Sequence, residues 1–289
     1  MAHWLDPLIQ GTLLGGLYAL YATSLSLIFG IMRLVNLAHG DLIVLATYMI
    51  LVLFATLGLP IALAVALAVM GMFAIGYVLQ KVVLNRTLGG DILPPLLVTF
   101  GLSIILQNGL MEAFSADSQR LKIGALESAS IRLGGGIAVG VMPMLTFLTA
   151  VAVVLGLNLL SYRTRLGRAF RATSDDPEIA QIVGIDNRRT YALAMGLALG
   201  IAALAAFFIG ARANFDPSIG PARLLYAFEA VIIGGLGSLW GTLAGGVVLG
   251  VAQSIGASIS PEWQILAGHL AFLLILVVRP RGLFPRAMD

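Results

Sequence analysis

Eight long apolar runs separated by short polar stretches constrain this chain more than any other feature. The runs occupy residues 7–32, 37–57, 59–80, 92–114, 137–160, 190–211, 224–258 and 263–278. The hydrocarbon core of a bilayer accommodates roughly 20 apolar residues per helix, and a spanning segment must satisfy its backbone hydrogen bonds internally. The pattern therefore predicts an all-α, polytopic bundle of transmembrane helices.

Composition excludes several other classes of protein. Only 11% of the 289 residues are charged and 59% are apolar, whereas soluble domains average about 25% charged residues. The net charge of +3 arises from Lys and Arg scattered through loops, which is typical of a topology signal and not of nucleic-acid binding. The chain has no cysteine, which excludes disulfides, thiolate catalysis and thiolate metal sites. Because the N-terminal segment lacks a basic n-region, we expect a retained first span, not a cleaved signal peptide.

The seventh run and the basic residues together predict the topology. The run 224–258 has 35 residues, which is too long for one crossing. Its glycines favour two shorter helices joined near residues 237–241, which gives about nine crossings. With the N-terminus outside and the C-terminus inside, twelve Lys and Arg residues fall in inner loops and five in outer loops, as the positive-inside rule expects. With eight crossings one terminus would lie on the other side of the membrane. The arginines within residues 279–286 would then no longer fit the positive-inside rule.

Two loops stand out within the single transmembrane domain predicted over 1–289. The outer loop 115–136 is expected to form either a small extracytoplasmic cap or a flexible connection. The inner loop 161–189 is the most charged stretch of the chain. We therefore expect chemistry or partner contact at the inner loop.

The inner loop is predicted to contain one short helix between two irregular segments. Asp175 or Asp176 can cap its N-terminus, and Pro177 is tolerated in a first turn. Glu178 follows Asp175 by three residues, as in a capping box. Gly184 is a typical residue to end the helix.

This short helix would present one apolar stripe, because Ile179, Ile182 and Val183 are spaced at i, i+3 and i+4. A helix of barely two turns is not stable alone in water, so it must rest on another surface: the membrane domain itself, the lipid interface or another protein. Two interpretations stay open: the helix lies on its own transmembrane bundle, or it inserts into a cytoplasmic partner.

The same segment carries a family resemblance. Glu178, Ala180 and Gly184 have the spacing of the EAA loop of ABC importer permeases, although Ile179 replaces the middle Ala of the triplet. The surrounding loop is similar to that of the branched-chain amino acid ABC transporter permease family, of the LivH type. Blocks at 30–42, 98–108, 232–246 and 273–284 resemble the same family in the same order. Thr242 departs from the pattern where a smaller apolar residue is expected.

The resemblance implies a permease subunit of an ABC importer in the bacterial cytoplasmic (inner) membrane. It implies a second permease, similar or identical, two cytoplasmic ATPase subunits and an extracytoplasmic substrate-binding protein as partners. ATP and Mg would be bound by the ATPases, so this chain would hold no cofactor and would not itself be an enzyme. By position, the ATPase-coupling residues would be Arg168, Arg171, Asp175, Asp176, Glu178, Ile179, Ala180, Ile182, Val183 and Gly184.

The substrate implied by the resemblance is a branched-chain amino acid or a related small polar or organic-acid compound. Relatives in the family import other amino acids, urea, short amides or aromatic acids. No residue in the sequence separates these substrates.

Polar side chains inside apolar runs are costly, so those inside the runs, together with Asn36 directly before the second run, are candidates for the translocation path. These residues are Asn36, His39, Asp41, Gln107, Asn108 and Glu229. The segment 35–42 is either an interfacial turn with a satisfied His and Asp or part of an inner gate. Its Asp is expected close enough to pair with the neighbouring His or with Arg33.

The remaining polar groups also leave alternatives open. Glu229 either lines a vestibule or pairs with Arg223 or Arg212, while the two amides at 107 and 108 are typical of hydrogen bonds between helices. Gln253 and His269 are expected to form such bonds as well. G-x-x-x-G patterns at 11–15, 196–200, 241–245 and 246–250 predict close helix packing.

Missing motifs bear on the remaining function classes. The chain lacks G-x-x-x-x-G-K-[ST], the phosphate-binding motif of an ATPase. It also lacks H-E-x-x-H and G-x-S-x-G, which disfavours an intramembrane hydrolase, and no metal site is predicted. An ion-coupled secondary transporter or channel is the alternative, in which Asp41 and Glu229 carry a proton and the broken seventh run forms a discontinuous helix. The charged cytoplasmic helix argues against this alternative.

Overall fold

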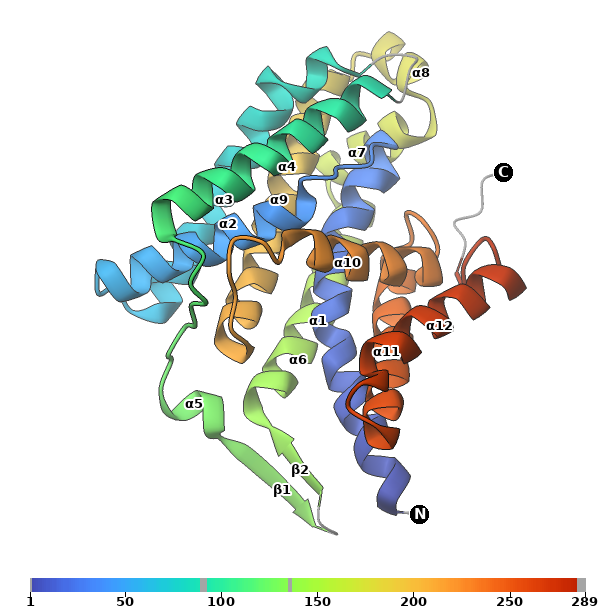
Figure 1. The fold of residues 1–289 in the computed structure, drawn as a ribbon. Coiled ribbons are helices and arrows are strands. Elements are labelled where there is room, and N and C mark those ends of the chain that lie inside the picture. Colours follow the sequence, from blue (N-terminus) through green and yellow to red (C-terminus); the bar gives the residue numbers. More distant parts are fainter. Residues whose placement is uncertain (1, 89–92, 135–136, 285–289) are drawn as a thin grey trace. The chain divides into compact units, whose positions relative to one another are not determined.

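The protein is almost entirely helical (Figure 1). The structure, a computed structural model, describes residues 2–88, 93–134 and 137–284. The long helices are α1 (Ala2–Met32), α2 (His39–Leu51, continued by the π-helical η1, Val52–Thr56), α3 (Ile61–Val82), α4 (Leu93–Phe114), α6 (Val141–Arg163), α9 (Asn187–Arg212) and α11 (Leu239–Ile259). The shorter elements are η2 (Leu84–Arg86), α5 (Ala125–Ser128), β1 (Ser130–Gly134), β2 (Ile137–Gly140), α7 (Arg165–Asp175), α8 (Pro177–Ile182), α10 (Gly220–Gly234) and α12 (Trp263–Val278).

Seven helices of the described chain are long and apolar enough to cross a membrane. The first six of them begin and end within about five residues of a predicted apolar run, and α11 forms the second part of the seventh run. The seventh run is broken as expected, because α10 ends at Gly234 and α11 begins at Leu239. The turn between them uses Gly235 and Gly237, both at positive φ, a conformation that glycine adopts without steric cost. Since α10 and α12 have only 15 and 16 residues, the count of nine crossings stays a prediction.

The chain divides into two compact units. Unit 1 comprises Met1–Ser26, Lys122–Val154 and Leu225–Asp289, and unit 2 comprises Leu27–Leu121 and Leu155–Leu224. In unit 2, α9 is buried along most of its length, whereas α3 buries a single stripe. That stripe consists of every fourth residue: Ala64, Ala68, Met72, Gly76 and Gln80. The rest of α3 is apolar except for Lys81 and is half-buried or exposed, as expected for a helix that faces lipid on its outer side.

Glycines bring helix backbones together in both units, as the G-x-x-x-G patterns predict. In unit 1, a Cβ added at Gly15 would lie 2.5 Å from the Cα of Val247, and one at Gly250 would lie 2.3 Å from the carbonyl oxygen of Gly11. In unit 2, a Cβ at Gly76 would lie 2.7 Å from the carbonyl oxygen of Met195. A side chain at any of these positions would therefore push two helices apart.

Two local predictions were wrong. Residues 137–140, assigned above to the start of a span, form β2, which pairs antiparallel with β1. The predicted outer loop thus contains a short helix and one strand of a hairpin, while its residues 135–136 lie outside the described part. Residues 165–175 are helix α7 and not an irregular segment. Its buried residues Gly167, Phe170 and Ser174 recur at i, i+3 and i+7 among arginines, a helical pattern too short of apolar residues to mark a span.

Candidate functional site

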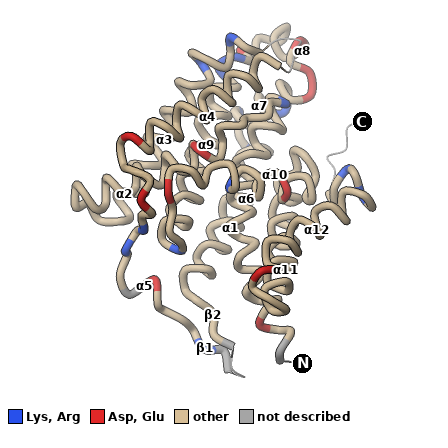
Figure 2. The backbone as a smooth tube through the Cα atoms, viewed as in Figure 1, with Lys and Arg blue, Asp and Glu red and all other residues tan. Residues whose placement is uncertain are grey.

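The most charged stretch of the chain folds into the consecutive helices α7 and α8, where basic and acidic residues lie close together (Figure 2). Thr164 caps α7, because its hydroxyl oxygen accepts a hydrogen bond from the Gly167 N–H at 3.0 Å. Asp176 caps α8 by accepting from the N–H groups of Glu178 and Ile179 at 2.9 and 3.0 Å. Of the two capping residues considered from sequence, Asp176 fills the role, and Asp175 ends α7.

The predicted apolar stripe of α8 is exposed to solvent. Ile179, Ile182 and Val183 have exposed fractions of 58%, 83% and 68%, while Ala180 on the opposite face is buried. Gly184 follows with φ +90°, a left-handed conformation that closes the helix. In the protein alone, the structure therefore contradicts the interpretation in which these three apolar side chains pack against the chain's own bundle.

Hydrogen bonds hold α7 and α8 firmly to other helices of unit 2. The Asn187 side chain at the start of α9 accepts from the Thr173 hydroxyl at 3.1 Å and donates to the Pro177 carbonyl at 2.6 Å. The Ser174 hydroxyl donates to the carbonyl of Gly30 near the end of α1 at 2.5 Å. A force applied to α8 would therefore reach two long helices. Sequence reasoning missed these contacts. The residue that starts α9 is Asp186, which caps the helix by accepting from the Arg189 N–H at 3.1 Å, and an Asp in this position is a typical helix-start signal.

The other residues proposed for ATPase coupling lie on α7 and α8. Arg168, Asp175 and Glu178 are exposed. Arg171 is half-buried, and its guanidinium lies 4.9 Å from the centre of the Tyr162 ring. A cation above an aromatic face is attracted to it, so Arg171 helps to fix α7 on the end of α6.

The polar residues near the start of α2 are buried in unit 2. Asn36, His39 and Asp41 are at most 1% exposed. The Asn36 side-chain oxygen accepts from the Ala38 N–H at 3.1 Å, which stabilises the turn before α2. Asp41 accepts from the Ser103 hydroxyl on α4 at 2.5 Å. Ser103, which the sequence analysis did not single out, therefore joins α4 to α2.

The two amides of α4 differ in their surroundings. Gln107 donates to the Ser103 hydroxyl at 3.1 Å and so extends the chain of hydrogen bonds that ends at Asp41. Asn108 is exposed and donates to the Ile104 carbonyl of its own helix at 2.8 Å. The spacing of four residues between Ser103 and Gln107 places them on one face, a signal that was available in the sequence.

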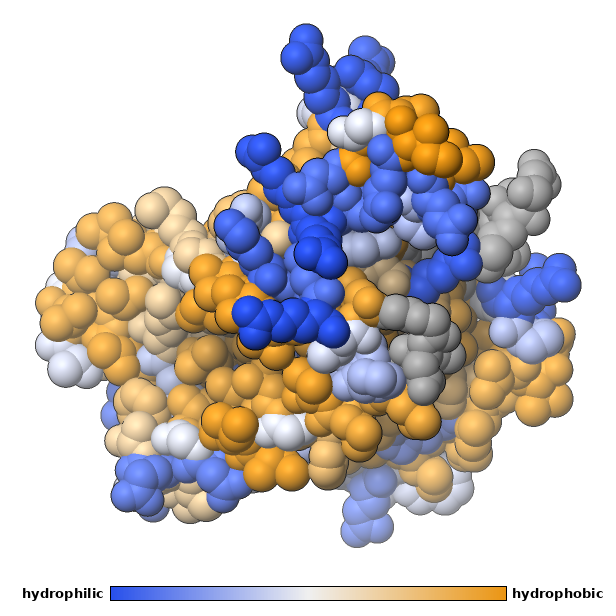
Figure 3. All heavy atoms as spheres, turned by 90° about the horizontal axis from the view of Figure 1, so that it is seen from above, coloured by the Kyte–Doolittle hydropathy of each residue, from blue (hydrophilic) through white to orange (hydrophobic). Residues whose placement is uncertain are grey.

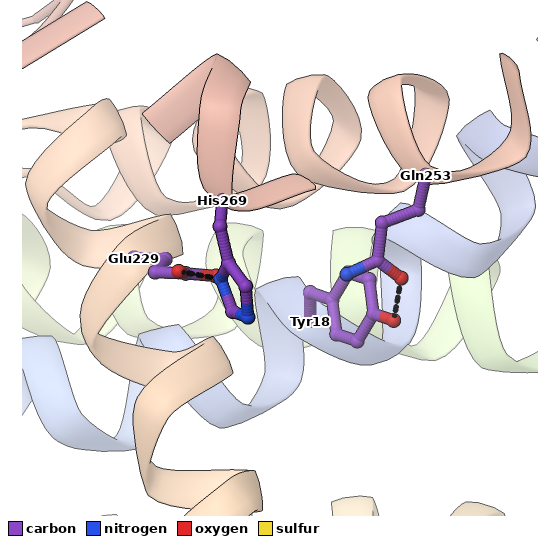
Figure 4. A network of polar contacts seen from close by, with 4 residues as sticks. All are labelled: Tyr18, Glu229, Gln253 and His269. Carbon is purple, nitrogen blue, oxygen red and sulfur yellow. Dashed lines mark hydrogen bonds and ion pairs between the residues drawn. The ribbon is translucent and has the colours of Figure 1, made fainter. Parts of the chain in front are cut away.

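Glu229 pairs with His269 in unit 1, and not with either arginine proposed from sequence (Figure 4). Glu229 on α10 is 2% exposed, and its carboxylate meets the His269 ring nitrogen Nδ1 from α12. Figure 4 also shows the Tyr18 hydroxyl of α1 pointing to Gln253 of α11, which accepts its hydrogen bond at 2.5 Å. As predicted, His269 and Gln253 hydrogen-bond between helices. Within the described residues, no group of three or more His, Asp or Glu side chains could hold a metal ion.

Comparison with known proteins decides the family. The family model described as "Branched-chain amino acid transport system / permease component" matches residues 8–279. The chain belongs to this permease family. It is 32% identical to the high-affinity branched-chain amino acid transport system permease protein BraD of Pseudomonas aeruginosa, over 98% of this chain and 96% of that protein. It is 26% identical to the corresponding LivH protein of Escherichia coli K12, with the same coverage.

The chain is also similar to a permease named for a sugar and to one solved structure. The fructose import permease protein FrcC of Rhizobium meliloti is 30% identical over 84% of this chain and 69% of that protein. The solved structure of PsaBC from Streptococcus pneumoniae in complex with Fab aligns with a TM-score of 0.50 at 14% identity, over 94% of this chain and 92% of that chain. FrcC is a similar permease that is named for a sugar. The similarity to PsaBC, at 14% identity, concerns the fold alone.

Proposed function

We propose that this permease is the membrane-spanning subunit of an ABC importer that takes up branched-chain amino acids or related small substrates. The observation that carries the proposal is the exposed apolar stripe of α8, a capped helix that is bonded to α9, next to α7, which is bonded to α1. Exposed apolar side chains grouped on one short helix favour a protein partner. Separate ATPase subunits are the partners that the family resemblance implies.

The mechanism follows from how α8 is attached. ATP and Mg bind to two partner ATPases, and their closure moves the stripe at Ile179, Ile182 and Val183. The hydrogen bond from Asn187 to Pro177 passes this displacement from α8 to α9, and the bond from Ser174 passes the accompanying movement of α7 to α1. The spans then rock as bodies and open the path inward. This chain supplies the path and the coupling surface, while hydrolysis occurs on other chains.

The proposed assembly has a second permease, similar or identical to this one, and receives substrate from an extracytoplasmic binding protein. The chain crosses a bacterial inner membrane about nine times, with its N-terminus outside and its C-terminus inside. The candidates for the translocation path are Asn36, His39, Asp41, Gln107, Asn108 and Glu229. Among them, Asn108 is exposed and the first three and Glu229 are buried.

The test is uptake and ATP hydrolysis by the reconstituted complex with Ile182→Asp. A charge in the middle of the stripe should uncouple the ATPases, so that uptake falls at least tenfold while the permease stays in the membrane. Ile182→Val keeps an apolar side chain at the same position and should transport normally. Unchanged uptake by Ile182→Asp would overturn the coupling assignment.

Purification from native membranes identifies the partners and the substrate class. Walker-motif ATPases and a binding protein should accompany the chain, and the ligand on that binding protein distinguishes an amino acid from a sugar. Recovery of this chain alone, from an extraction that preserves other membrane complexes, would favour the ion-coupled carrier or channel.

A further inference from the structure

Unit 2 contains a cavity of about 670 Å³ at one end of its helices. Its lining comes from the end of α1 and the residues after it, from η2 and Leu88, from the start of α4, from α8, and from the first turns of α9. Apart from α8, these are the ends of candidate membrane spans, so we expect the cavity at the level of the lipid headgroups. In the predicted topology, this is the inner face of the membrane.

The polar part of the lining is basic. Arg33 and Arg188 both line the cavity and both are exposed, and no Asp or Glu is among the described residues that form it. Asn85 joins them, and its side chain donates to the Arg188 carbonyl at 3.1 Å, which fixes the backbone that carries this guanidinium. The nearest carboxylates in sequence are occupied as helix caps: Asp186 accepts from Arg189 N–H and Asp176 caps α8. The lining therefore favours an anion.

The backbone at Arg33 is held in an uncommon conformation. Its φ is +52°, in the left-handed region that residues other than glycine seldom adopt. Such conformations cost free energy and persist where surrounding structure enforces them, often at binding sites. Here the strained turn follows α1 directly and places the arginine in the cavity wall.

The rest of the lining is apolar. Met32 and Leu34 are buried in the wall beside Arg33, and Leu96 contributes from α4. Seen from this end of the molecule, strongly hydrophilic side chains gather beside apolar ones (Figure 3). A free inorganic anion would gain nothing from the apolar part, whereas a phospholipid has an anionic headgroup joined to hydrocarbon.

We propose that this cavity binds the phosphodiester headgroup of an anionic phospholipid. Arg33 and Arg188 contact the phosphate, and the apolar wall takes the first carbons of an acyl chain. Basic pockets between the ends of membrane helices suit such headgroups, and arginine matches phosphate oxygens with paired N–H donors. Because Pro177 and Gln181 of α8 also line the cavity, a bound lipid would touch the helix that carries the exposed stripe. The binding site itself does not depend on the proposed transport function.

The experiment compares two charge-matched double variants of the full chain, purified with its associated subunits in mild detergent. Arg33→Gln with Arg188→Gln removes both cavity cations, and Arg86→Gln with Arg189→Gln removes two exposed arginines that do not line the cavity. Dioleoylphosphatidylglycerol, dioleoylphosphatidylcholine and inorganic phosphate are titrated separately, and bound lipid is counted by native mass spectrometry. The wild type and the control should retain phosphatidylglycerol, while the cavity variant should bind it about tenfold more weakly.

Thermal unfolding distinguishes a loss of lipid binding from a loss of stability in the variants. Without added lipid, the cavity variant should unfold at the wild-type temperature, and only the wild type and control should gain stability with phosphatidylglycerol. Equal retention of phosphatidylcholine, or equal loss in both double variants, would overturn the site. Protection by inorganic phosphate as strong as that by lipid would identify a free anion instead. Loss of the associated subunits with unchanged lipid retention would assign the arginines to a protein interface.

Discussion

Single buried carboxyl groups carry much of the polar organisation of this permease. Asp41 is 1% exposed and accepts a hydrogen bond from Ser103 over a separation of 62 residues. Ser103→Ala removes that donor, so it should lower the free energy of unfolding by about 1–2 kcal/mol and lower the thermal midpoint in detergent. Asn108→Ala on the same helix removes an exposed bond to its own backbone and serves as the control. Equal midpoints for the two variants would contradict the role given to Ser103.

The Glu229–His269 pair allows a sharper test at the residue scale. His269→Ala leaves the buried Glu229 carboxyl without the hydrogen-bond partner seen here, and an uncompensated buried charge costs more than a missing hydrogen bond. We expect His269→Ala to destabilise the protein by about 1–3 kcal/mol. Adding Glu229→Gln should restore part of the loss, because the amide carries no charge. Thermal midpoints of the four proteins form a double-mutant cycle, and purely additive effects would show that the two side chains are not coupled.

At the scale of elements, glycine contacts set the distance between helices. A Cβ at Gly15 on α1 would meet the backbone of Val247 on α11 at 2.5 Å, whereas one at Gly101 on α4 would meet nothing within 4 Å. Gly15→Ala should therefore lower the thermal midpoint by several degrees, because neither backbone can move without separating the helices. Gly101→Ala should be neutral or slightly stabilising, since Ala favours helix more than Gly does. A reversed order of the two midpoints would refute close packing of α1 on α11.

The elements also show what sequence can and cannot predict. The spans, the break near Gly237, the cap at Asp176 and the stripe on α8 were predictable, because each follows from local periodicity or capping chemistry. Helix α7 was missed because its few buried side chains lie among arginines. Partners of buried polar groups were not predictable: Glu229 and His269 are 40 residues apart, and only packing of α10 on α12 brings them together.

At the scale of the whole molecule, the topology prediction is directly testable because the chain has no native cysteine. Ile182→Cys, Leu126→Cys and Phe284→Cys each place one thiol at an exposed site. With nine crossings and the N-terminus outside, a membrane-impermeant maleimide added to spheroplasts should label only Leu126→Cys. Inside-out vesicles should give the opposite pattern, with labelling at the other two positions.

The side from which Phe284→Cys is labelled tests the number of crossings. In the predicted topology, residue 182 lies inside and α9 then takes the chain to the outer face. Three further crossings by α10, α11 and α12 return it to the inner face, so residues 182 and 284 must be labelled from the same side. Labelling of Phe284→Cys from the outer side would mean that one of the two short helices, α10 or α12, does not cross. The twelve-to-five distribution of basic residues would then no longer support an inner C-terminus, since Arg279 and Arg281 would lie outside. In detergent-solubilised samples the maleimide should label all three thiols, which would show that each thiol is reactive when no membrane separates it from the reagent.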